Sequence, residues 1–584
     1  YTSINLIQKF NAHHEFTIRL NHDILEQSGS FSLENAQKKI GKSVLIRLQQ
    51  LHFSSDVAYE FRGIICEIKM EQSGNSNSDI VLVGYSPTIL LENGQDLSSF
   101  YENDLKKIVE KLTKPLNQVN CNVSIKPQYT KQIKYICQYK ESSFHFINRL
   151  SSEFSEFFYY DGKDLNFGKP TSIKEIEVVY GEDISSMQLT LRAKPMKFTN
   201  YGYLSKTDKI ESYDAPTNVN GMGQYASYIL KESDNLFSEP VNMPVKQRIE
   251  NKSDLENFVK KQKASMAANL EVLTGTSYNP LICIGSVINV KVSKLQELSH
   301  IREDYGKFLV IGIEHHVNEN GKYYNSFEAV PSEVEVLPVA NVVMPLAEPQ
   351  IAAVKDNKDP DGAGRVRVQM LWQTGNDMTD WIRVMTPDAG GGKDGARNRG
   401  FVAIPEKGDQ VLVCFRYNDP DRPFVMGSLF HGKNGGGGGS GNSVKSLTAL
   451  SGGYIQINGN ELWMVDPEGN FVHLDGAGNI MIKASAEISL VVGDSYIVIR
   501  PSEIGIKSAA IDIHGTTEAS MRKDHNTKFK VSGSSALMKA DTATMFAKTA
   551  KVKGVTTAKV SGAKVTVEAT GKAEVKGGIV EING

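Results

Sequence analysis

Residues 551–584 read KVKGVTTAKVSGAKVTVEATGKAEVKGGIVEING, and no large apolar residue occurs among them before Ile579. Valine, alanine and glycine alternate with lysine, threonine and glutamate, which is the two-residue period of a β-strand. A lone chain of such small residues buries too little apolar area to offset the entropy lost on ordering it. A single flat sheet would also expose sticky edges. The stretch therefore predicts a fold that needs more than one chain.

Three identical chains winding around one axis as a three-sided β-prism solve both problems. Each strand would be hydrogen-bonded to strands of the neighbouring chains, with Val, Ala, Ile and Gly at the narrow axis and lysine, threonine and glutamate in water. We expect corners, where the backbone turns or shifts face, at Gly554, Gly562, Gly571 and Gly577. A disordered tail is the alternative, but the sustained valine alternation fits it poorly.

The same alternation extends back to about residue 444 with larger inward residues. The expected strands are SGGYIQING, ELWMVD, FVHLDGAGNIMIKA, AEISLVVGDSYIVIRPSEIGIKSA and AIDIHG. Before them, HGKNGGGGGSGNS (431–443) superficially resembles a phosphate-binding loop, but it lacks the GK[ST] ending. We interpret residues 433–443 as a flexible linker and 444–584 as the prism, a needle-like domain.

Residues 1–340 are predicted to form strand-rich barrels with a few inserted helices. We expect helices over 97–113, with Asn103 as a possible cap, and over 142–158, and a hairpin around Asp161 and Gly162. A third helix follows Ser253, which forms a capping box with Glu256. Residues 345–432 contain about five short strands bounded by Gly, Pro, Asp or Asn, which suits an OB-fold barrel.

Composition excludes several classes of protein. The 584 residues carry a net charge of −2, so no global attraction to nucleic acid or membrane is expected. No stretch of about 18 apolar residues could span a bilayer. The first residues lack a basic region followed by an apolar run, so no signal peptide is expected. We expect buried, reduced thiols at the five cysteines, Cys66, Cys121, Cys137, Cys283 and Cys414.

Several linked motifs resemble the signature of VgrG, the valine-glycine repeat spike family of type VI secretion. They lie in AAVKDNKDPDGAGRVRVQMLW (352–372), DWIRVMTPDAGGGKDG (380–395) and FVAIPEKGDQVLVCFRYNDPDRPFVMGSLFHG (401–432). YICQYKESSFHFINRLSSEFSEFFYYDG (135–162) resembles a more divergent motif of the family's hub domain. The motif residues of the OB region are Asp356, Asn357, Asp359, Pro360, Gly364, Arg365, Trp372, Trp381, Arg383, Gly408, Asp409, Asp419, Pro420, Pro423 and Gly427.

The resemblance implies a homotrimeric puncturing spike. Its hub would resemble that of contractile phages and sit on a hexameric Hcp-like tube protein, with the OB barrel as a neck and the prism as the needle. A PAAR-type tip protein would cap a small apolar platform of Ile579, Val580 and Ile582. Baseplate proteins, effectors and transient contact with a target-cell envelope complete the expected partners, assembled in the bacterial cytoplasm and then injected. The baseplate hub-spike of a contractile phage tail is the alternative.

Nothing in the sequence predicts catalysis, a cofactor or a metal. The adjacent pairs His13-His14 and His315-His316 point to opposite faces of a strand and lack the spacing of a helical zinc motif. No G-x-S-x-G elbow occurs. By the resemblance, a lysozyme domain or a terminal toxin domain is expected to be absent. The OB strands lack the basic and aromatic platform for stacking on bases, so no nucleic acid is expected, and Trp372 and Trp381 are interpreted as core or interface residues. A needle-borne enzyme acting on cell-wall glycan is the remaining alternative.

Overall fold

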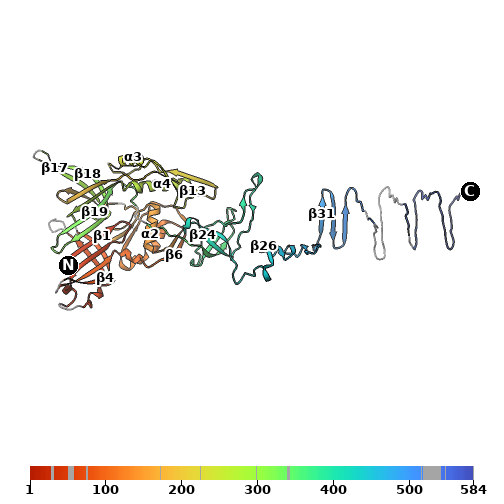
Figure 1. The fold of residues 1–584 in the computed structure, drawn as a ribbon, viewed down its shortest axis with the longest axis horizontal. Coiled ribbons are helices and arrows are strands. Elements are labelled where there is room, and N and C mark those ends of the chain that lie inside the picture. The colour runs from red at the N-terminus through yellow and green to blue at the C-terminus, as the bar shows by residue number, and fades with distance from the viewer. Residues whose placement is uncertain are drawn as a thin grey trace. The chain divides into compact units, whose positions relative to one another are not determined.

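The computed structural model describes residues 1–27, 32–49, 58–73, 77–170, 172–223, 225–296, 299–338, 342–513, 516, 541–545 and 548–582. The chain divides into two compact units, Tyr1–Val444 and Lys445–Gly584, which are described separately. Strands dominate both units, as predicted (Figure 1). Among the described residues, no helix is both long and apolar enough to cross a bilayer.

An eleven-stranded sheet forms the largest part of the first unit. Its strand order is β17-β11-β12-β16-β19-β18-β1-β2-β5-β4-β3, and β17 also pairs with β18. The strands are β1 Ser3–Lys9, β2 Glu15–Asn21, β3 Ser43–Leu48, β4 Tyr59–Ser73, β5 Asn77–Tyr85, β11 Glu175–Tyr180, β12 Ile184–Leu191, β16 Glu271–Ser277, β17 Val287–Gln296, β18 Ser299–Val317 and β19 Tyr323–Pro331.

The pairing of β17 with β18 closes six of these strands into a barrel. Its interior is filled by apolar residues such as Val178, Leu273, Ile288 and Val310. The second expected barrel is different: β1 to β5 continue from β18 as a sheet whose hydrogen-bonded ring does not close among the described strands. That sheet packs instead around a second core that includes helical residues such as Ile108 and Phe146. Helices therefore complete this core, which the strands do not enclose alone.

Shorter strands and four α-helices make up the rest of this part in the described ranges. The remaining strands of this part are β6 Asp96–Asn103, β7 Asn122–Ile125, β8 Ile133–Glu141, β9 Phe158–Tyr160, β10 Asp164–Phe167, β13 Phe198–Leu204, β14 Lys209–Asp214 and β15 Val241–Pro244. The helices are α1 Leu105–Leu112, α2 Ser143–Phe154, α3 Ala226–Leu236 and α4 Lys252–Ala267. The antiparallel pair β9 and β10 confirms the hairpin predicted around Asp161 and Gly162.

Two predicted helix starts were wrong. Residues 97–103 belong to strand β6, paired with β8, and α1 begins only after Asp104, whose carboxylate accepts the backbone N–H of Lys107. The third predicted helix starts at Asn251, which accepts the N–H of Asp254, rather than at the predicted capping box. In both cases a nearby residue with a better cap geometry replaced the expected one. Helix α3 was not predicted at all.

Residues 342–431 form a small closed barrel. Four strands lie in the order β21-β20-β24-β25, namely β20 Gln350–Asp356, β21 Arg367–Met370, β24 Gln410–Phe415 and β25 Pro423–Ser428. Single bridges from Ile382 to Val366 and from Val384 to Val425 join the two ends of this sheet. A minor hairpin, β22 Ala389–Gly390 with β23 Arg399–Gly400, extends from the barrel.

The second unit consists of antiparallel ladders. One sheet contains β26 Val444–Thr448, β27 Tyr454–Asn458, β28 Glu461–Val465, β29 Phe471–Leu474 and β30 Ile480–Lys483, and the other contains β31 Ile488–Val492, β32 Ser495–Arg500 and β33 Glu503–Lys507. Consecutive strands therefore pair within one chain. Residues 510–513 form no strand, and the rest of the predicted AIDIHG strand lies outside the described residues.

The stretch that begins at residue 551 has no strand in a single chain. Residues 541–545 and 548–582 are exposed and irregular. Gly554, Gly562, Gly571 and Gly577 do not adopt positive φ. Small residues without a partner chain have nothing to bury against, so this arrangement agrees with the physical argument, and the prism itself stays a prediction.

Candidate functional site: a barrel junction and an apolar strand face

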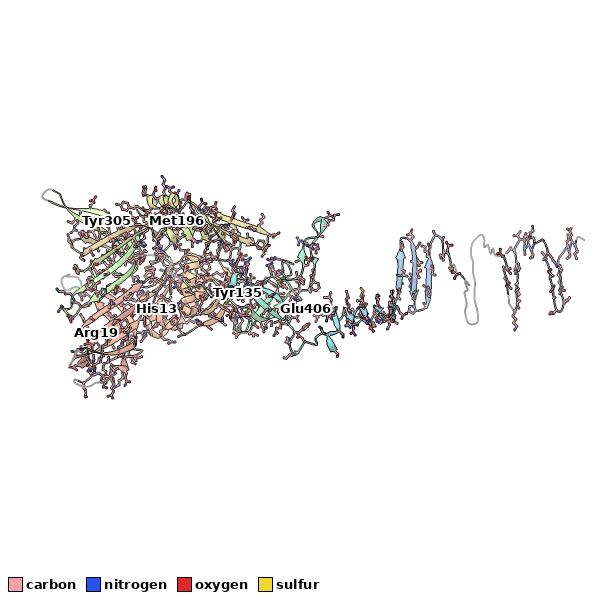
Figure 2. The ribbon with its side chains drawn as sticks, viewed as in Figure 1. His13, Arg19, Tyr135, Met196, Tyr305 and Glu406 are labelled. Carbon is pink, nitrogen blue, oxygen red and sulfur yellow. The ribbon has the colours of Figure 1, made fainter. Side chains whose placement is uncertain are left out.

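Most OB-region motif residues hold turns of the small barrel. Arg365 donates two hydrogen bonds to the Asp359 carboxylate, of 2.9 Å from Nε and 2.6 Å from Nη2. This ion pair lowers the pKa of Asp359 well below its usual range. Asn357 donates to the Glu406 carboxylate (2.9 Å), which Figure 2 labels. Gly364 has a φ of +68°, a conformation that favours glycine.

The other motif residues have comparable structural roles. The Trp372 indole donates to Gln350 and packs against the barrel core. Asp409 accepts the backbone N–H of Glu406 at 2.9 Å. Asp356 ends strand β20, and Pro360 and Gly408 lie in turns. The other residues are Trp381 and Arg383 on the segment that closes the barrel, Pro420 before β25, and Pro423 and Gly427 within β25.

The structure adds a buried ion cluster that joins the small barrel to the eleven-stranded part. Arg149 of α2 is fully enclosed, and its guanidinium donates to Glu141 (3.0 Å), Glu153 (3.0 Å) and Asp421 (3.3 Å). The Asp421 carboxylate also accepts the backbone N–H of Cys137 at 2.7 Å. Burial raises the pKa of Asp421 well above its ordinary value, and Arg149 opposes that rise.

One hydrophobic core runs through this junction. Tyr135, Cys137 and Tyr139 of β8 pack in the same cluster as Val368 and Val413 of the small barrel. Tyr135, labelled in Figure 2, is almost fully buried there. The two regions are therefore fused through shared apolar side chains rather than held apart by a linker.

Polar contacts surround the shared core. Arg248, in the loop before α4, pairs with Asp380 at 2.6 Å. Gln373 donates to Ser99 of β6 at 2.7 Å, and the guanidinium of Arg367 lies over the Tyr101 ring at 4.2 Å. Sequence reasoning missed Arg149, Asp421 and Arg248 as junction residues. Only Arg149 lies within the 135–162 stretch that resembles the hub motif.

His315 and His316 lie in β18, as predicted, whereas the prediction was wrong for His13 and His14, which lie in the connection just before β2. One member of each pair, His14 or His315, is buried. The Gln8 side-chain amide donates to Nδ1 of His14 (2.9 Å), and the Gln8 oxygen faces Nε2 of His315 at 3.1 Å. The Nδ1 of His315 accepts from the hydroxyl of Tyr323 at 2.7 Å. Burial lowers the pKa of both histidines to about 3, so both rings are neutral at neutral pH.

The thiols differ from expectation. Cys121 and Cys137 are buried, Cys283 and Cys414 are half-buried, and Cys66 is exposed. Cys66 was expected inside because of its apolar neighbours, but its side chain points to the solvent face of β4. Among the described residues, no group of three or more His, Cys, Asp or Glu side chains is arranged to hold a metal ion.

The second unit presents strands with one wholly apolar face. Directly opposed residues of an antiparallel pair share a face, and the register gathers eight apolar side chains in the first sheet: Ile455, Ile457, Leu462, Met464, Val472, Leu474, Ile480 and Ile482. In the second sheet it gathers six: Ile488, Leu490, Ile497, Ile499, Ile504 and Ile506. Leu490 is 58% and Ile504 67% exposed in the single chain. These faces need a covering partner.

The expected tip residues are also uncovered. Ile579 and Ile582 are 85% and 88% exposed, and Val580 is about half exposed. They lie on irregular chain, so no platform is formed by one chain alone.

Comparison with known families identifies the class of protein. Residues 14–321 match the family described as phage tail baseplate hub (GPD). Since this match covers more than half of the chain, the chain belongs to the phage tail baseplate hub family. Residues 350–430 match the type VI secretion system/phage-baseplate injector OB domain, which confirms the OB fold predicted for this region.

Individual relatives confirm the resemblance to VgrG. The chain is similar to the type VI secretion system spike protein VgrG1b of Pseudomonas aeruginosa, with 22% identity over 425 residues, or 67% of this chain. It spans 54% of that relative, about half its length. A solved Francisella PdpA–VgrG complex has a similar fold, with a TM-score of 0.50 and 7% identity over 82% of this chain and 76% of that one.

Another similar structure comes from Escherichia coli. It is described as a component of the type VI secretion system with structural similarity to the T4 bacteriophage tail proteins gp27 and gp5, and it gives a TM-score of 0.46 and 14% identity. The alignment covers 73% of this chain and 96% of that chain.

Proposed function

We propose that the chain forms the homotrimeric puncturing spike of a type VI secretion machine. Its hub (residues 1–340) would sit on a hexameric Hcp-like tube protein, its OB barrel (345–432) would form the neck, residues 433–443 the linker, and residues 444–584 the needle. The relatives named as spike proteins support this assignment.

The wholly apolar faces of the second unit are the observation that carries the proposal. Fully burying one Ile or Leu side chain contributes roughly 1.5–3 kcal/mol, so each half-exposed residue gains about 1 kcal/mol when it is covered. Eleven of the fourteen face residues are exposed in one chain, which gives a driving force on the order of 10 kcal/mol per chain that three chains meeting at an axis would realise.

The role is mechanical rather than enzymatic. The motif side chains are occupied by turns and ion pairs, and the buried histidines are hydrogen-bonded within the hub. We infer that the spike is assembled in the bacterial cytoplasm and injected when a sheath contracts, and that a PAAR-type tip protein, effectors and baseplate proteins accompany it. The baseplate hub-spike of a phage tail is the second candidate, because the hub match is to a phage tail family.

Deletion of the gene in a bacterium that carries it tests the function. Export of the tube protein into the medium should stop, while the tube protein remains in the cells, and the intact chain supplied in trans should restore export. Undiminished export without the chain would contradict the proposal. Loss of infectious phage particles instead of export would favour the second candidate.

A further inference from the structure

A cavity of about 450 Å³ opens between the hub and the OB barrel. Four arginines line it, Arg248, Arg383, Arg416 and Arg422, against a single carboxylate, that of Asp421. Asp421 is already engaged by Arg149 and by the backbone of Cys137. The cavity wall therefore carries excess positive charge.

Two of the four arginines are neutralised within the chain. Arg248 pairs with Asp380 (2.6 Å) and Glu250 (3.2 Å). Arg422 pairs with Asp419 (2.9 Å) and donates to the backbone oxygen of Val245 at 2.8 Å. Both side chains are thus fixed as structural parts of the junction.

Arg383 and Arg416 have no such partner. No carboxylate among the described residues lies within ion-pair distance of either guanidinium. The cavity walls desolvate the Arg416 guanidinium and thereby lower its pKa, and repulsion from Arg422 lowers it further. Both arginines are exposed to solvent, so an anion can reach guanidinium groups that lack a counter-charge and accept charge-assisted hydrogen bonds from them.

The rest of the lining specifies the kind of anion. Trp381, Met385 and Phe424 form an apolar wall beside the guanidinium groups, and Met385 is 53% exposed. A bare inorganic anion would leave this wall in water. A ligand with a carboxylate next to an apolar side chain would match both the guanidinium groups and the apolar wall. Guanidinium groups bind carboxylates through paired hydrogen bonds.

A neighbouring copy of this chain is a poor candidate for the occupant. The hairpin segment 386–401 extends from the same barrel and is the obvious element for another copy to present. It carries three basic residues, Lys393, Arg397 and Arg399, and only two acidic ones. Its charge does not complement the cleft.

We propose that this cleft binds an acidic segment of a partner protein, in which glutamate or aspartate alternates with apolar residues. Arg383 and Arg416 bind the carboxylates, and Trp381, Met385 and Phe424 cover the apolar side chains. The assignment does not depend on the trimeric needle.

Fluorescence anisotropy with a labelled hexapeptide of alternating phenylalanine and glutamate tests the proposal on the full-length protein. The double variant Arg383→Gln/Arg416→Gln should weaken binding by about tenfold or more, equivalent to losing one charge-assisted contact. The control Arg397→Gln removes the same charge from the exposed hairpin and should bind as the wild type does. The same peptide with glutamine in place of glutamate should bind at least about tenfold more weakly.

Several results would overturn the proposal: no binding to the wild type, equal binding by the double variant, or equal binding of the glutamine peptide. Full competition by inorganic phosphate at the peptide's own concentration would mean that the site takes a free anion. A lower solution mass for the double variant, with an unchanged melting temperature, would mean that a second copy fills the cleft.

Discussion

Arg149 is the cation at the centre of the buried ion cluster at the junction. It is fully enclosed and faces three carboxylates, of Glu141, Glu153 and Asp421. The last of these lies 272 residues away in sequence, so no local pattern could have paired them. The Asp419 carboxylate accepts the backbone N–H of Asp421 within the turn before β25, whereas the Asp421 carboxylate reaches out of that turn to Arg149.

Replacing Arg149 should therefore be costly. Arg149→Leu keeps much of the volume but leaves three buried carboxylates without a cation, and we expect a loss of about 3–5 kcal/mol in the unfolding free energy. Arg47→Leu removes an exposed partner of Glu60 and should change it by less than about 1 kcal/mol. Urea unfolding of both variants measures the difference. An equal loss of unfolding free energy in the two variants would show that the buried ion cluster contributes no more to stability than an exposed ion pair.

The buried histidines predict how the hub responds to acid. The pKa of His14 and His315 is about 3 in the fold, against about 6.5 in an unfolded chain. Between these values the unfolded state binds more protons, so stability is full above about pH 6.5 and falls as the pH is lowered towards 3. Each histidine should contribute a slope of about 1.4 kcal/mol per pH unit.

Unfolding monitored between pH 7 and 4 checks this slope. His315→Gln removes one titrating group and should flatten the profile, even if it lowers stability throughout. His316→Gln alters the neighbouring residue on the other strand face and should leave the slope unchanged. A profile with the same slope in all three proteins would contradict the assignment.

At the scale of elements, alternation of apolar residues predicted strands well and their partners poorly. The ladder from β27 to β33 follows the predicted strands, because a period of two is a local property of the sequence. The prediction of helix starts was wrong where two residues able to cap a helix lie close together. Asp104 caps α1 instead of Asn103, and Asn251 caps α4 instead of Ser253. The pairing of β17 with β18 closes one barrel, and helices complete the core beside β1 to β5. Both depend on contacts between distant segments, so neither can be predicted from one segment alone.

The two faces of β31 offer a matched test of the needle. Leu490 lies on the apolar face, opposite Ile497, and Val491 lies on the other face, opposite Tyr496. Both are more than half exposed in one chain, at 58% and 62%. Leu490→Asp would bury a charge at the trimer axis and should disperse the assembly, whereas Val491→Asp keeps its charge in water.

Sedimentation of the two variants at equal concentration measures the effect. The account predicts a lower mass for Leu490→Asp and an unchanged mass for Val491→Asp. If both variants keep the wild-type mass, or if the second is the one that disperses, the assigned inward face is wrong.

At the scale of the whole molecule, one chain is an incomplete structure. The hub and OB barrel have cores of their own, whereas the second unit exposes most of its large apolar residues. The sequence alone indicated this imbalance, since the valine, alanine and glycine strands at 551–584 lack enough area to fold alone. The predicted number of three chains rests on a physical argument about a narrow axis rather than on any contact within one chain.

The solution mass of the purified full-length protein, measured by light scattering, tests this central claim most directly. The chain has a mass of 64.4 kDa, and the account predicts a particle of three times that mass, stable on dilution. A particle with the mass of one chain would contradict the account, because the apolar faces and the small-residue strands would then have nothing to bury against.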